Sequence, residues 1–179
     1  FTWSFLERRI RATNSVDNRP IFAEVSLISS HAPWTPILPV LEDWDNIGNG
    51  AIFERWKNAG ERPEELWRDL DKIRKHYALS VDYAIKAMTG YAERYVDNQI
   101  LLIVLGDHQA APLITGEDTS RAVPVHIISG EQELVQPFLD WGFESGALPD
   151  PNEPAQGMDT FRDWFVRAFS KSDRITETT

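Results

Sequence analysis

The sequence predicts an α/β fold in which helices cover a mostly parallel sheet. Three apolar runs, Ile21–Ile28, Gln99–Leu105 and Val123–Ile128, have the composition of strands. Helical patterns separate strand candidates along the chain, an order that is typical of parallel sheets. The middle run is apolar at consecutive positions, as expected for a strand that is buried on both faces.

The helices are predicted from apolar spacing and from end signals. Pro63 suits the first turn of a helix, and the acidic residues after it suit the positive end of the helix dipole. Apolar residues at three- and four-residue spacing then predict a helix that ends near Tyr95. The other expected helices cover residues 1–12, 131–139 and 159–169.

Prolines and a Gly-Asn-Gly cluster predict a long irregular loop from Pro33 to about Gly60. Loops of this length in compact domains are usually functional or mobile. Residues 171–179 are polar and are predicted to form a flexible tail. We therefore expect one domain over residues 1–170, followed by that tail.

Composition excludes several classes of function. The 179 residues carry 18 Lys and Arg against 28 Asp and Glu, so the net charge is −10. A chain this acidic repels nucleic acids and anionic lipid surfaces, and no basic patch is visible that would compensate. The absence of cysteine excludes disulfides, thiol catalysis and zinc–thiolate sites. No run approaches the roughly 20 apolar residues that cross a bilayer.

The strand over Gln99–Leu105 is followed by Gly106, Asp107, His108 and Gln109. In open α/β sheets ligands bind beyond the carboxyl ends of strands, and glycine allows a sharp turn there. A carboxylate and an imidazole can together bind a divalent cation. The alternative is that Asp107 caps a turn and His108 makes a local hydrogen bond.

A second polar motif, SSHAPW, follows the strand over residues 21–28 and places His31 at a strand end. We expect His31 at the same edge of the sheet as Asp107 and His108. The alternative is that His31 orders its own proline-rich loop and that Trp34 packs in the core. His126 lies within the third strand, where a hydrogen-bonded core histidine is the simpler interpretation.

Four features in order resemble the C-terminal half of the alkaline phosphatase superfamily, in its sulfatase-like branch. They are SSHAPW, an amphipathic helix over Ser80–Tyr95, GDHQ, and the run RAVP at residues 121–124. The pattern is similar to that of membrane-anchored sulfatase-like proteins, which include phosphoglycerol and phosphoethanolamine transferases. It spans about Pro20 to Ser129 and implies a partial alkaline phosphatase-like fold.

The resemblance also implies roles for individual residues. Asp107 and His108 match metal ligands of the family, and the metal would be one divalent cation, namely Mn, Zn, Mg or Ca. His31 matches a histidine that contacts the phosphate or sulfate of the substrate or a second metal, and Trp34 accompanies it. Arg121 and His126 are further candidates for the site.

Three departures from the family pattern limit what this chain is expected to do. The nucleophilic Ser or Thr and an acidic ligand belong to an N-terminal half that this chain lacks, so no catalytic residue is assigned. Gln109 stands where the family has glycine, and Leu27 stands where two-metal members have aspartate. We therefore expect a fragment that binds one metal weakly, or holds none, and is inactive alone.

The leading hypothesis is the C-terminal part of a metal-dependent hydrolase or transferase acting on phosphate or sulfate esters. The alternative is a non-catalytic α/β binding domain that retains the sulfatase-like fold. In the full-length protein the partner would be a small anionic ester or a phospholipid headgroup. The resemblance implies the extracytoplasmic face of a membrane, reached only through segments outside this chain. Exposed fragment surface would also allow a homo-oligomer.

Overall fold

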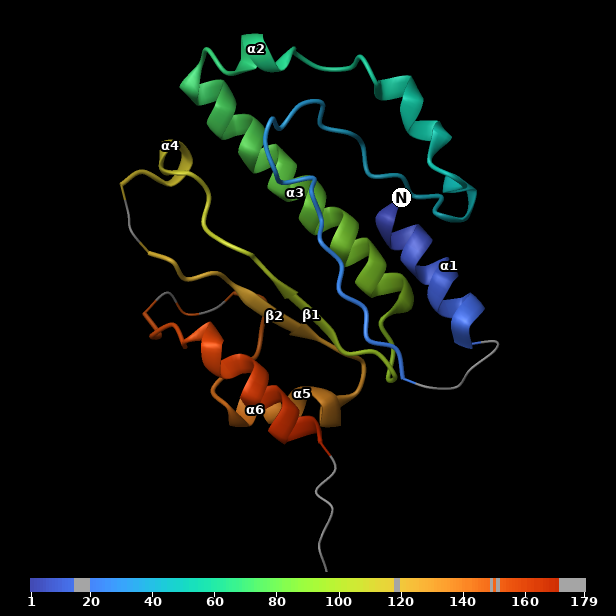
Figure 1. The fold of residues 1–179 in the computed structure, drawn as a ribbon, viewed down its shortest axis with the longest axis vertical. Helices are drawn as coiled ribbons and strands as arrows, with labels where there is room; N and C mark the ends of the chain where they lie inside the picture. Colours follow the sequence, from blue (N-terminus) through green and yellow to red (C-terminus); the bar gives the residue numbers. More distant parts are fainter. Residues whose placement is uncertain (15–19, 118–119, 149, 151, 171–179) are drawn as a thin grey trace, which may run out of the picture. The chain divides into compact units, whose positions relative to one another are not determined.

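A computed structural model describes residues 1–14, 20–117, 120–148, 150 and 152–170 of the chain. The chain divides into two compact units. Unit 1 comprises Phe1–Val96 with Ala110–Thr119, and unit 2 comprises Asp97–Gln109 with Ser120–Thr179. Figure 1 shows the elements of both. The predicted tail, residues 171–179, lies outside the described residues.

Unit 1 is helical in its described part and is organised by one long helix, α3 (Leu70–Tyr95). The Asp69 carboxylate caps this helix, accepting hydrogen bonds from the backbone N–H groups of Asp71 and Lys72 at 3.0 and 3.2 Å. The predicted helices at the N-terminus, at Pro63 and before Tyr95 are confirmed. Around α3 lie α1 (Thr2–Asn14), α2 (Pro63–Leu66), α4 (Pro112–Thr115) and the 3₁₀ turns η1 (Asp45–Ile47) and η2 (Ala51–Trp56).

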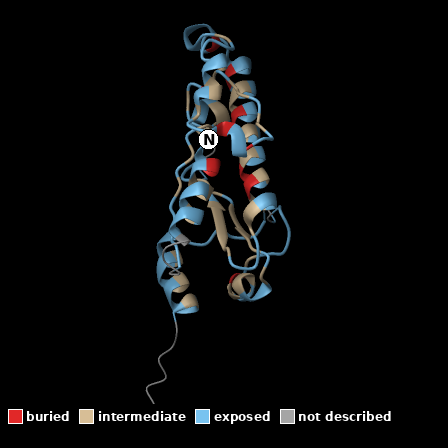
Figure 2. Ribbon diagram, turned by 90° about the vertical axis from the view of Figure 1, so that its right-hand side faces the viewer, coloured by how far each residue is buried: buried red, intermediate tan, exposed pale blue. Residues whose placement is uncertain are grey.

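Stacked aromatic rings join α1 to α3. Trp3 of α1 stacks on Tyr91 of α3, with 4.5 Å between ring centroids. Trp44, from the long loop, lies 6.5 Å from the same Tyr91 ring, and its carbonyl accepts a hydrogen bond from the buried Ser4 hydroxyl at 3.0 Å. The buried residues of α3 (red in Figure 2) include Ile73, Ser80, Met88 and Tyr91. The core of unit 1 is thus aromatic and depends on the loop as well as on the helices.

Unit 2 holds the only sheet in the part of the chain that the structure describes, and it is small. Strands β1 (Leu102–Leu105) and β2 (Val125–Ile128) pair antiparallel, with Leu102 opposite Ile128 and Leu105 opposite Val125. The prediction of a mostly parallel, alkaline phosphatase-like sheet flanked by helices is therefore wrong. Residues of β1 are half-buried, and Leu105 is exposed, so this strand is not covered on both faces.

Two physical reasons account for the error. Parallel strands need a crossover of about a dozen residues or more, usually a helix. Among the described residues between β1 and β2, the only helix is the four-residue α4. In addition, the predicted strand over residues 21–28 is not a strand, because it pairs with no backbone in the part of the chain that the structure describes. Side chains of strand type are not sufficient for a strand, which also needs a partner.

The core of unit 2 is a cluster of aromatic side chains between α5 (Gln132–Asp140) and α6 (Phe161–Phe169), preceded by the 3₁₀ turn η3 (Met158–Thr160). Both helices confirm the predicted ones. Phe138 is completely buried, and Trp141 stacks on Trp164 with 4.0 Å between ring centroids. Five rings surround Phe138, those of Phe143, Phe161, Trp164, Phe165 and Phe169. In neither unit do the described residues include a helix that is long and apolar enough to cross a membrane.

Replacing Phe138 by alanine should destabilise unit 2 strongly, because it removes a buried ring and leaves a cavity among aromatic neighbours. The expected loss is about 3–5 kcal/mol in the free energy of unfolding. Urea unfolding followed by tryptophan fluorescence would measure it. Val166→Ala, at a half-exposed position of α6, is the control and should cost less than 1 kcal/mol or so. A Phe138→Ala loss no larger than the control would contradict this packing.

Burial, and then the charge and hydrogen bond of Glu7, raise the pKa of Tyr91 to about 12 from 10.0. Because the folded protein holds the phenol proton more tightly than the unfolded chain, unfolding becomes easier as pH rises from about 10 to 12. Tyr91→Phe keeps the ring but removes this titration. The stability of the wild type should therefore fall more steeply across that window than that of the variant, as measured by urea unfolding at each pH. Parallel curves would contradict the assignment.

Candidate functional site

The Asp107–His108 pair lies in unit 2, in a turn that begins where the β1–β2 ladder ends. The Gly106 N–H donates to the Pro124 carbonyl at 3.4 Å, and the Gln109 side-chain amide donates to the Ala122 carbonyl. A side chain at Gly106 would press on Val123, since an added Cβ would lie 3.3 Å from that residue. The turn is thus fixed at both ends to the segment that leads into β2.

Within this turn the two side chains face each other. The His108 Nε2 atom lies 3.5 Å from Asp107 Oδ2, and both side chains are exposed, 74% for the imidazole and 90% for the carboxylate. The other oxygen, Oδ1, accepts the backbone N–H of His108 at 3.0 Å. The His108 Nδ1 atom lies 2.7 Å from the Gln109 carbonyl oxygen. Local hydrogen bonding, the alternative to metal binding, therefore uses Asp107 Oδ1 and His108 Nδ1. It leaves Asp107 Oδ2 and His108 Nε2 available.

No group of three His, Asp or Glu residues suited to a metal occurs within the described ranges. The two further candidates belong to the same unit. His126 is half-buried in β2, opposite Val104 of β1, and Arg121 is exposed in the segment before β2. Within the described residues, Asp107 and His108 could therefore supply only two donor atoms to a metal, without a third such side chain beside them.

The SSHAPW motif lies in unit 1 as a compact loop with an unusual backbone at Trp34. Trp34 has φ of +58°, a left-handed conformation that costs a bulky residue of order 1–3 kcal/mol. Its ring is buried, stacks on Trp67 at 5.3 Å and meets Tyr77 edge-on at 5.4 Å. Its indole N–H donates to the Ser30 carbonyl at 2.8 Å. These contacts fit the interpretation of Trp34 as a packing residue, and its role in substrate binding stays a prediction.

Two side chains of helix α3 also contact the backbone of this loop. The Ser80 hydroxyl, which is buried, donates to the Ser29 carbonyl, and His76 Nδ1 lies 3.1 Å from the Trp34 carbonyl oxygen. His31 itself is exposed, with Nδ1 2.9 Å from the Ala32 carbonyl oxygen. Its hydrogen bond within the loop fits the alternative in which His31 orders its own segment.

His31 and Trp34, the two predicted substrate contacts, do line one pocket of about 390 Å³ in unit 1. Its walls are mostly apolar and come from residues 1–3, residues 27–38, Phe53 and α3. Burial raises the pKa of Tyr83, one of its polar groups. The other polar side chains are Thr2, Ser29, Thr35 and Ser80. The arrangement suits an apolar ligand that carries a hydrogen-bonding group.

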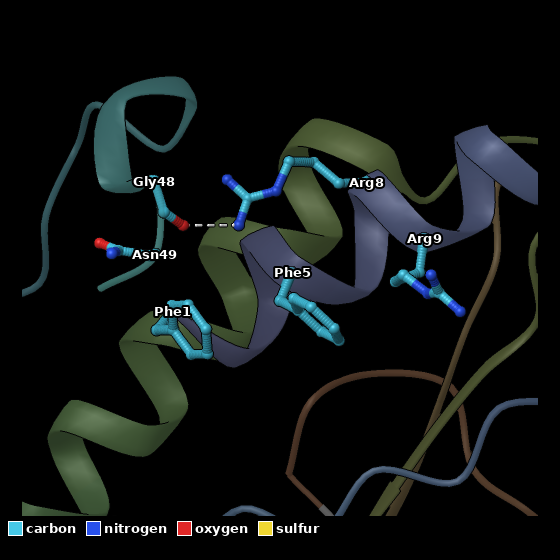
Figure 3. A pocket seen from close by; sticks show the side chains of 6 residues that line it. All are labelled: Phe1, Phe5, Arg8, Arg9, Gly48 and Asn49. Carbon is cyan, nitrogen blue, oxygen red and sulfur yellow. Dashed lines mark hydrogen bonds between the residues drawn. The ribbon is translucent and has the colours of Figure 1, made fainter. Parts of the chain in front are cut away.

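A second hollow of about 380 Å³ lies between α1 and the Gly48–Asn49 turn (Figure 3). The rings of Phe1 and Phe5 lie stacked along it, with centroids 5.8 Å apart. The Arg8 guanidinium points toward the turn and donates to the Gly48 carbonyl at 2.8 Å. Through this contact Arg8 holds the long loop, so the hollow is a mostly apolar surface that Arg8, Arg9 and Asn49 border.

The predicted convergence of His31 with Asp107 and His108 has lost its basis, because residues 21–28 are not part of the sheet. His31 belongs to unit 1 and the other two to unit 2, so the convergence itself stays a prediction. Sequence reasoning missed Ser80 and Tyr83. Their spacing of three residues places both on one helix face, but nothing in the sequence connected that face to SSHAPW.

Comparisons with models of known protein families, with curated proteins and with solved structures found no match for this chain.

Ser80→Ala should loosen the SSHAPW loop, because it leaves the Ser29 carbonyl without its donor from α3. We expect a loss of about 1–3 kcal/mol in stability and faster amide hydrogen exchange over residues 29–36. Ser145→Ala, at an exposed serine, is the matched control and should leave both unchanged. Unchanged exchange in Ser80→Ala would show that the hydroxyl does not hold the loop.

Proposed function

We propose that this chain contributes two metal ligands, Asp107 and His108, to an enzyme that acts on phosphate or sulfate esters. The observation that carries the proposal is the facing pair of donor atoms, His108 Nε2 and Asp107 Oδ2, exposed at the end of β1. The resemblance of GDHQ, SSHAPW and RAVP to the sulfatase-like branch supplies the reaction class. The two-stranded antiparallel sheet does not support that resemblance, so the donor pair is the main support.

The hydrogen bond at Nδ1 makes His108 a suitable ligand. A carbonyl oxygen only accepts, so Nδ1, at 2.7 Å from the Gln109 carbonyl, carries the proton. In the neutral imidazole this leaves a lone pair on Nε2, on the side of Asp107. Metal-binding histidines commonly have this arrangement, with the second ring nitrogen donating to a carbonyl.

The separation of the two donors also fits one ion. Ligand atoms of zinc lie about 2.0–2.2 Å from the metal, so two of them can stand no more than about 4 Å apart. The 3.5 Å between Nε2 and Oδ2 meets this limit. A divalent cation held there would lower the pKa of a hydroxyl nucleophile and neutralise charge on the transferring group. The chain's own residues would orient the ligands.

A second function, ligand binding without catalysis, is favoured by the mostly apolar pocket beside His31. Under this alternative the Asp107–His108 pair only shapes its turn, and metal binding is absent. The metal titration below separates the two functions, because only the enzyme proposal requires that the pair bind a cation.

Titration of the tag-free chain with Zn²⁺ or Mn²⁺ should show one weak site that Asp107→Asn and His108→Ala each weaken at least about tenfold. The affinity should be low, because two ligands leave most of the coordination sphere to water. Calorimetry measures the affinity, and ¹⁵N shifts of the imidazoles identify the histidine involved. Asp140→Asn, an exposed carboxylate elsewhere in unit 2, is the control.

Equal metal affinity in the wild type, Asp107→Asn and His108→Ala would contradict the proposal. A metal-dependent shift at His31, His76 or His126 with none at His108 would contradict it as well.

A further inference from the structure

Residues 21–28 (IFAEVSLI) are a strand-like segment without a strand partner among the described residues. Figure 1 draws them as an uncoiled run of chain in blue. No hydrogen bond from the described residues reaches the backbone of residues 21–27, and only at Ile28 does the carbonyl accept one, from His31 N–H at 3.0 Å. Backbone groups without partners along a β-prone segment are a template for pairing with another strand.

The side chains of this segment are exposed in the manner of a strand with one covered face. From Glu24 to Ile28 exposure alternates, with Val25 and Leu27 half-buried and the residues between them exposed. Phe22 is 90% exposed and Ile28 is 82% exposed. Among the described large apolar side chains, only Leu148 is comparably exposed, at 90%. Two of the three most exposed apolar side chains thus lie on one eight-residue segment.

We propose that this segment pairs antiparallel with the same segment of a second copy of the chain, centred on Val25. This register places Phe22 of each copy opposite Ile28 of the other copy. The dimer therefore holds two such pairs, and in each pair the two exposed apolar side chains cover one another. It also places Glu24 opposite the neutral Ser26. Parallel in-register pairing would instead place Glu24 opposite Glu24, which like-charge repulsion disfavours.

The segment is therefore self-complementary in both shape and charge, as a two-fold symmetric interface requires. Backbone hydrogen bonds would supply the general affinity, and the two Phe–Ile pairs would set the register. An interface of two short strands is small, so the dimer is expected to be weak and concentration-dependent.

The first test is sedimentation velocity of the full chain from about 1 µM to about 1 mM. A monomer–dimer equilibrium is expected, and Phe22→Asp or Ile28→Asp should abolish the dimer. Both positions are exposed, so circular dichroism should show unchanged folding. Leu148→Asp, at an equally exposed leucine in unit 2, should dimerise like the wild type. A chain that stays monomeric over the whole range overturns the proposal, as does a dimer lost in Leu148→Asp but kept in Phe22→Asp.

The second test addresses the register. In Ser26→Lys, the lysine of each copy lies opposite Glu24 of the other copy. These two pairs should tighten the dimer roughly two- to thirtyfold, while Ser26→Glu should weaken it by a similar factor. Ser145→Lys and Ser145→Glu make the same charge changes at an exposed serine in unit 2 and correct for net charge. Equal effects at Ser26 and Ser145 would overturn the antiparallel register, even if a dimer forms.

Discussion

A β-strand exists only when a second backbone accepts and donates its hydrogen bonds, and this constraint decides what the chain can build. β1 has one described partner, β2, and the pair is antiparallel. The described part of the connection between them holds no helix long enough for the crossover that parallel pairing needs. Residues 21–28 have no strand partner among the described residues. The small sheet, the position of the Asp107 turn and the open segment all follow from this distribution of pairing.

Aromatic packing takes the organising role that a larger sheet would otherwise have. In unit 1 the ring of Tyr91 receives Trp3 from α1 and Trp44 from the long loop, so one side chain joins three segments. In unit 2 Phe138 has the same role between α5 and α6. Large rings suit this task because each buries much apolar area and fixes the geometry of its neighbours. Both units can therefore be compact although neither contains an extensive sheet.

Sequence reasoning succeeded where structure depends on neighbours in the chain. The helices ending at Tyr95 and Phe169 were predicted because apolar spacing of three and four residues is a local signal. The sheet was mispredicted because strand pairing depends on distant segments, and apolar runs in the sequence do not show which segments pair. The candidate sites divide in the same way. Asp107 and His108 are adjacent in sequence and so adjacent in space, whereas the contact of Ser80 with SSHAPW spans 51 residues.

The turn at Gly106 shows how a short sheet can still hold the Asp107–His108 pair in place. Only four residue pairs form the ladder, but hydrogen bonds to the Pro124 and Ala122 carbonyls continue the attachment past its end. The backbone of the Asp107–His108 pair is thereby fixed. Both side chains are largely exposed, but each has a contact within the turn, Asp107 Oδ1 with the His108 N–H and His108 Nδ1 with the Gln109 carbonyl oxygen. If the pair binds a cation, as proposed, the two side chains therefore need little further ordering, which is a small entropic cost.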